Sequence, residues 1–117
     1  MIKNPISVPE AKINIRSKLS LSELAKDISS KILMGVQFDG RDKYILNEDP
    51  AIFFRPFLGL QFVLWYDVDE RKYFTFEINK FDCFSAFEAV KIEYIDISGF
   101  VKLLFTAAGF EVIDEND

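Results

Sequence analysis

The segment 49–67 carries a single charge, on Arg55, between its two terminal aspartates. Its two apolar runs, 51–57 and 58–66, are rich in aromatic and branched residues, which favours strands over helices. Both sides of the second run are largely apolar, which is typical of a strand that is covered on two faces or lies at a contact surface. Pro56 cannot donate to a ladder, so it predicts a bend, a bulge or a sheet edge in the first run.

The run after the acids of 67–70 alternates between apolar and polar residues, which predicts another strand. The acids lie between the two strands, so they predict a hairpin turn. In 71–80, Phe74, Phe76 and Ile78 share one side, which predicts the partner strand. Shorter strands are expected at 12–16, around 44–46, at 91–96 and at 110–113. The segment between the last two central strands, "FDCFSAFEAV", is consistent with either a short helix or a loop.

Two segments have helical periodicity. In "SLSELAKDISSKILMG", Ser20 and Glu23 have the spacing of a capping box, and Gly35 is placed to adopt the left-handed conformation after the helix. The second helix, "DISGFVKLLFTAAG", can be capped by Asp96 or Ser98. Its buried stripe is expected to consist of Phe100, Val101, Leu104, Phe105 and Ala108.

Strands cluster in the middle of the chain and the helices lie near both ends. This order predicts an α+β fold, with a single mostly antiparallel β-sheet and two main helices packed against one face. The 117 residues fit a single domain, 1–117, with an acidic C-terminal tail at about 114–117 that is expected to fray.

The composition disfavours several classes of partner. Lysine and arginine total 14 and aspartate and glutamate 19, so the net charge is −5, which repels nucleic acid and steers a basic partner toward the chain. The start of the chain lacks the apolar core of a signal peptide, and the longest charge-free apolar stretch, 56–66, is far shorter than the roughly 20 residues that span a bilayer. With a single cysteine and no membrane segment, a cytoplasmic protein is expected.

Few residues are suited to catalysis. The sequence contains no histidine, and Cys83 lies beside an acid, an environment that is expected to make a thiol less reactive. The acidic turns do not fit a calcium loop, and their paired carboxylates are expected to be solvated. We therefore expect no catalytic residue, no metal, no cofactor and no enzymatic activity.

The aromatic residues allow three interpretations. They can fill the core, line a cavity for a small ligand, or lie partly exposed at a protein-binding surface. Core packing is favoured for most of them, whereas for Trp65 core packing and partner contact are equally compatible with the sequence. The residues concerned are Phe53, Phe54, Phe57, Phe62, Trp65 and Phe74.

Four segments resemble the small immunity proteins of bacterial contact-dependent or polymorphic toxin systems. They are "KINIRSKLSLSELAKDISSKI", "NEDPAIFF", "FLGLQFVLWYD" and "DISGFVKLLFTAAG". The resemblance implies a cytoplasmic antidote that binds a cognate toxin domain, often a basic nuclease, and blocks its active site or substrate groove. Carboxylates of the antidote can then occupy the phosphate-binding positions of the toxin. The alternative is a small-ligand-binding or regulatory domain with an aromatic-lined cavity.

The acidic turns and the end of the central strand form the candidate partner-binding surface. The acids would accelerate encounter with a basic toxin domain, and Trp65 would serve as a possible aromatic anchor. The protein is expected to be a monomer or a possible homodimer, because a copy of the chain could cover the doubly apolar strand. The candidate residues are Glu48, Asp49, Trp65, Tyr66, Asp67, Asp69 and Glu70, with Asp39 and Asp42 as a second group.

Overall fold

The computed structural model describes residues 6–35, 51–57, 59–66, 73–80 and 91–113, without the side chains of 52–57. The strand expected at 44–46, the ambiguous segment 81–90 and the tail 114–117 lie outside these residues. The elements are, in chain order, β1 (Ile6–Arg16), α1 (Leu21–Lys31), β2 (Ala51–Phe57), β3 (Leu60–Tyr66), β4 (Phe74–Lys80), β5 (Ile92–Asp96), α2 (Ser98–Ala107) and β6 (Glu111–Ile113).

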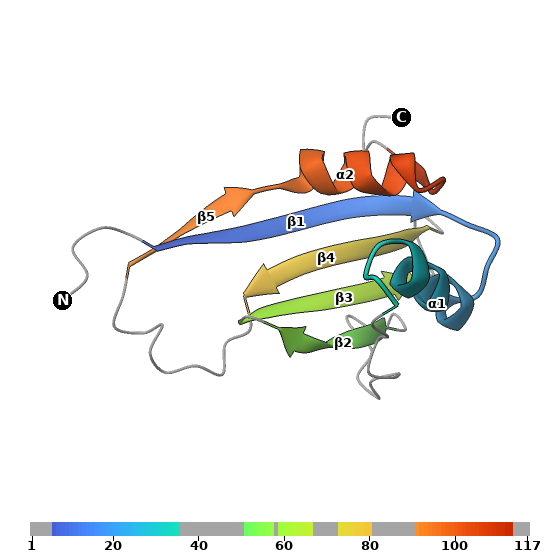
Figure 1. Ribbon diagram of the computed structural model, residues 1–117, viewed down its shortest axis with the longest axis horizontal. Helices are drawn as coiled ribbons and strands as arrows, with labels where there is room; N and C mark the ends of the chain where they lie inside the picture. Colours follow the sequence, from blue (N-terminus) through green and yellow to red (C-terminus); the bar gives the residue numbers. More distant parts are fainter. Residues whose placement is uncertain (1–5, 36–50, 58, 67–72, 81–90, 114–117) are drawn as a thin grey trace.

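The strands form one sheet in the order β2-β3-β4-β1-β5 (Figure 1). β6 also pairs with β1. All pairs are antiparallel except β1 with β5, which run parallel. The fold is therefore α+β with a mostly antiparallel sheet, as the order of sequence patterns predicts. The parallel pair was not predicted.

β1 is longer than the predicted strand 12–16, because it continues through Pro9 to Ile6. The backbone bonds from Ile6 N–H to the Lys91 carbonyl and from Ile97 N–H to the Glu10 carbonyl show that even-numbered residues of β1 bond toward β5. The backbone nitrogen of Pro9, which carries no hydrogen, therefore points to the β4 side of β1. The ladder between β1 and β4 starts only at position 11. The proline costs no ladder bond here, because it lies beyond the end of the neighbouring strand.

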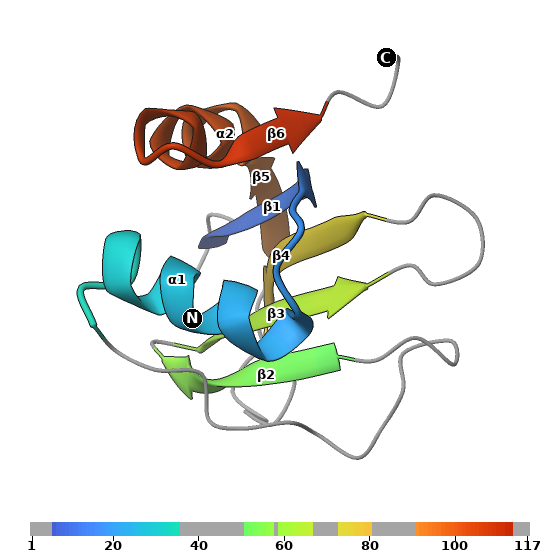
Figure 2. The ribbon, with the colours of Figure 1, turned by 90° about the vertical axis from the view of Figure 1, so that its right-hand side faces the viewer.

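Both helices cover the same face of the sheet (Figure 2). Leu24 and Ile28 of α1 and Val101 and Phe105 of α2 belong to one buried cluster with the inward side chains of β1, β3 and β4. The inward residues of β1 and β4 are the apolar members of their alternating patterns: Ile13, Ile15, Phe74, Phe76 and Ile78. Leu64 joins them from β3, whose two apolar sides did not indicate which one faces the helices. The expectation of two helices against one face is thus confirmed.

The termini of α1 follow the predicted local chemistry. The Ser20 hydroxyl accepts from Glu23 N–H at 3.2 Å, and the Glu23 carboxylate accepts from Ser20 N–H at 3.1 Å, which completes the capping box. Gly35 has φ +85°, the left-handed conformation that its position predicts, although the helix ends at Lys31.

The central strand is covered on both faces. Val63 and Leu64 are 3% and 0% exposed, and adjacent residues of a strand point to opposite sides of the sheet. On the face away from the helices, the Thr75 hydroxyl donates to Asn14 Oδ1 at 3.0 Å, and both side chains are buried. The apolar character of both sides of β3 therefore corresponds to burial on both sides.

Candidate functional site

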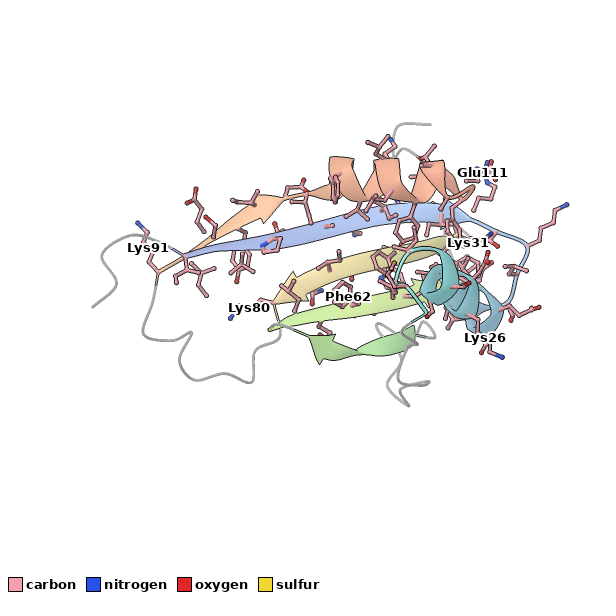
Figure 3. The ribbon with its side chains drawn as sticks, in the orientation of Figure 1. Lys26, Lys31, Phe62, Lys80, Lys91 and Glu111 are labelled. Carbon is pink, nitrogen blue, oxygen red and sulfur yellow. The ribbon has the colours of Figure 1, made fainter. Side chains whose placement is uncertain are left out.

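Exposed apolar side chains gather along one edge of the molecule, formed by the start of β1, β5 and α2. In Figure 3, Lys91, just before β5, and Glu111, at the start of β6, mark its two ends. Six of the eight large apolar residues exposed in the described part of the chain lie there, and the other two, Leu19 and Met34, flank α1. The six are Ile6, Tyr94, Ile95, Phe100, Leu103 and Leu104.

The outward side of α2 is apolar. Phe100 is 60% exposed, Leu103 65% and Leu104 41%, and with the exposed Ala107 they occupy positions i, i+3, i+4 and i+7 of one helical stripe. These four residues are called the apolar α2 face below. The only charge between positions 98 and 110 is Lys102, which lies outside this stripe.

The predicted burial of α2 was partly wrong. Val101 and Phe105 are buried at 4% and 0%, but Phe100 and Leu104, which were expected beside them, are 60% and 41% exposed, and Ala108 is half-buried. The helix has apolar residues around most of its circumference, so the 3.6-residue period alone does not determine which side faces the sheet. Phe105 occupies the core side, because its ring packs at 5.0 Å from Phe76 and 5.3 Å from Phe110.

The start of α2 is attached to the edge of β1. Ser98 Oγ accepts from the Lys12 backbone N–H at 2.9 Å, and Asp96 Oδ1 accepts from Ser98 N–H at 2.9 Å. These bonds bridge the part of the β1 edge that lies between its ladders with β5 and β6. The prediction that Asp96 or Ser98 is the capping residue was wrong in position: Ser98 is the first helical residue, and the N-cap residue is Ile97, which makes no side-chain cap.

Two hollows of about 290 and 320 Å³ flank this attachment point. Three carboxylates, Glu10, Glu77 and Asp96, line the first hollow, and neither hollow is lined by an aromatic side chain. Hydrogen bonding by Ser98, through its side chain and then its backbone N–H, lowers the pKa of Asp96. A carboxylic acid that donates a proton near neutral pH needs the opposite shift, so Asp96 is unsuited to that role.

No group of three metal-ligating side chains occurs within the described ranges. In the same part of the chain, neither helix combines the length and the apolar character that crossing a membrane requires.

Of the candidate partner-binding residues, only Trp65 and Tyr66 lie in the described segments. Tyr66 points to the helix side and packs on Phe74 with ring centroids 4.7 Å apart. Trp65, next in the strand, points to the opposite face and is partly buried; its indole N–H is buried and has no hydrogen-bond partner among the described residues. The two side chains therefore do not share one surface. The acids Asp39, Asp42, Glu48, Asp49, Asp67, Asp69 and Glu70 lie outside the described residues.

The aromatic side chains that the structure describes on the helix face are packed in the core. Phe74 is 4% exposed, and Phe62 packs against Phe76 with ring centroids 6.3 Å apart. The side chains of Phe53, Phe54 and Phe57 lie outside the described part.

The sequence analysis did not identify the apolar α2 face as a surface. The signal was present, because a helix with one charge and apolar residues all round it is expected to make contacts on two sides.

Comparison with known proteins gives no relative: no family model, no curated protein and no solved structure matches this chain. The chain is defined by its α+β fold and by the exposed apolar edge along β5 and α2.

Proposed function

We propose that this protein is an immunity protein, which binds a cognate toxin domain in the cytoplasm and neutralises it without catalysing a reaction. The observation that carries this proposal is the apolar α2 face. A helix face with side chains 41–65% exposed and no charge is unusual on an isolated surface and typical of a protein contact.

The charge of the chain supports a basic partner. The net charge of −5 favours encounter with a basic domain such as a nuclease, while the apolar face supplies the contact area that slows dissociation. Burial of Phe100 and Leu103 in a partner would form the centre of the interface. The acids expected from the sequence, including Asp67 and Asp69, would add to the negative charge that accelerates the encounter.

A small-ligand-binding function is less well supported. Phe62 and Phe74 fill the core on the helix face, and the two hollows near α2 have no aromatic lining. A non-catalytic role is supported by the lowered pKa of Asp96, in the hollow lined by three carboxylates, and by the absence of histidine from the sequence.

The test is neutralisation of a candidate toxin domain. If a gene upstream of this one encodes a large secreted protein with a variable C-terminal domain, that domain is the candidate. The toxin domain is expressed in bacteria with the wild-type chain, with Leu103→Glu, or with Met34→Glu, and growth is followed. Met34 is 92% exposed, far from α2 in sequence, and receives the same charge, so it is the matched control. We expect the wild type and Met34→Glu to restore growth. Leu103→Glu should bind the purified toxin domain at least about 10-fold more weakly than the wild type, because burying a charge in the core of an interface makes the binding free energy less favourable.

Failure of the wild-type chain to restore growth, together with no binding to the toxin domain, would refute the immunity function. If Leu103→Glu restores growth and binds the toxin domain as tightly as the wild type does, the immunity function stands, but the apolar α2 face is not the interface.

A further inference from the structure

The two edges of the sheet differ in how they are protected against pairing. β2, at one edge, contains Pro56, and its register with β3 shifts between positions 54 and 57. Prolines and bulges are common protections of an edge strand, because both interrupt the row of free N–H and C=O groups. β5, at the other edge, is the regular segment Ile92–Asp96 and has no proline, lysine or register shift.

The backbone of β5 directs a regular set of hydrogen-bonding groups away from β1. The Lys91 carbonyl and the Ile97 N–H bond to β1. Since backbone direction alternates along a strand, the groups of Ile92, Tyr94 and Asp96 point away from β1. No strand within the described residues pairs with this side of β5, which forms the outer rim of the sheet in Figure 1.

We propose that β5 pairs with β5 of a second copy of this chain, antiparallel about a two-fold axis at Tyr94, so that the sheet continues across a homodimer. In this register Ile92 faces Asp96 of the other copy, and the two Tyr94 residues face each other. All three outward-pointing residues of each copy are then used, which gives about six interchain hydrogen bonds, two for each of three residue pairs.

The charges of β5 favour this register. Glu93 stands opposite the exposed Ile95 of the other copy, and Asp96 opposite Ile92, so no carboxylate faces a carboxylate. Moving the axis one residue, to Glu93, would place the two Glu93 side chains directly opposite each other, and like charges in that position are destabilising. The exposed rings of Tyr94, each 49% exposed in the single chain, meet at the axis and bury apolar surface there.

The proposed partner of β5 is thus β5 of a second copy. When this five-residue segment pairs with itself, its outward backbone groups all form hydrogen bonds and no two carboxylates face each other. The dimer is independent of the immunity function. Since α2 follows the C-terminal end of β5, antiparallel pairing places the two α2 helices at opposite ends of the paired strands.

The experiment measures the mass of the purified full chain in solution by sedimentation over a range of concentrations. A five-residue strand pair is smaller than a standard interface, so we expect a dissociation constant of about 10–100 μM and a shift from 13.5 kDa toward twice that mass. Amide exchange adds a residue-level readout: Ile92, Tyr94 and Asp96 should gain protection as the dimer forms, whereas Ile95, already bonded to β1, should not change.

Two variants at the axis give a decisive comparison. Tyr94→Lys and Tyr94→Glu each place like charges opposite each other and should weaken the dimer at least about 10-fold, while an equimolar mixture should recover a heterodimer. Both substitutions are at an exposed position, and circular dichroism of each variant checks that it is folded. Leu103→Glu is the control on α2 and should dimerise as the wild type does.

A wild-type chain that remains at 13.5 kDa at about 1 mM overturns the proposal, since an affinity weaker than that is not a specific dimer. So does a dimer that Leu103→Glu abolishes and Tyr94→Lys leaves intact, which would assign the contact to α2. Pairing of β5 with a strand of the toxin domain, seen as protection of Tyr94 only in that complex, also overturns it.

Discussion

The two phenylalanines on opposite sides of α2 give a direct test of how this helix is oriented. Phe105 is 0% exposed and packs against Phe76 and Phe110, whereas Phe100 is 60% exposed. Replacing a buried phenylalanine with alanine costs about 3–5 kcal/mol, because a cavity remains. Burying a whole phenylalanine contributes about 1.5–3 kcal/mol, and roughly two fifths of Phe100 is buried, so Phe100→Ala should cost about 1 kcal/mol.

The assay is urea unfolding at fixed protein concentration, followed by circular dichroism, with the free energy of unfolding compared among the wild type, Phe100→Ala and Phe105→Ala. Phe105→Leu retains more of the side-chain volume and replaces the alanine variant if that variant does not fold. Equal losses at the two positions, or a larger loss for Phe100→Ala, would show that the orientation of α2 deduced above is wrong.

Two further predictions concern polar contacts. The hydrogen bonds of Ser20 lower the pKa of Glu23 from its ordinary 4.5, so they stabilise the fold above that pH and the contribution is lost as the pH falls through the lowered value. Unfolding measured from pH 7 to pH 3 should show a smaller acid-induced loss for Glu23→Gln than for the wild type; an unchanged profile would contradict this. Asn14→Ala should cost about 1–3 kcal/mol by leaving the buried Thr75 hydroxyl without its acceptor. The double variant Asn14→Leu with Thr75→Val should cost less than the sum of the single changes in urea unfolding, and strict additivity would exclude coupling between these residues.

Local chemistry made much of the fold predictable from the sequence. The capping box of Ser20 and Glu23, the alternation in β4 and the left-handed conformation of Gly35 each depend on neighbouring residues alone. The parallel pairing of β1 with β5 was not predictable in this way, because it joins segments 86 residues apart and no local pattern specifies the partner of a strand. The first half of β1 was also not predicted, because Pro9 argues against a strand. Whether that proline costs a ladder hydrogen bond depends on where β4 ends, which the sequence around Pro9 does not show.

The candidate surface was less predictable than the fold. The period of α2 shows that a helix forms but leaves two apolar sides to choose from, and only the packing of Phe105 against the sheet makes Phe100 the exposed one. For the same reason, the alternation in β3 places Trp65 and Tyr66 on opposite faces, but does not determine which of them contacts the helices.

The position of β1 has a consequence for synthesis. This strand leaves the ribosome before the other described elements, yet its neighbours are β4, β5 and β6. One edge therefore lacks its partner until residues 74–80 have been translated, and the other edge until residues 92–113 have been translated. Contacts between segments this far apart slow folding, because a long loop must close before they contribute. Until then an edge of the nascent strand is unpaired and the core around its apolar side lacks Val101 and Phe105 of α2, so we expect chaperone binding to the growing chain to be strongest in that interval.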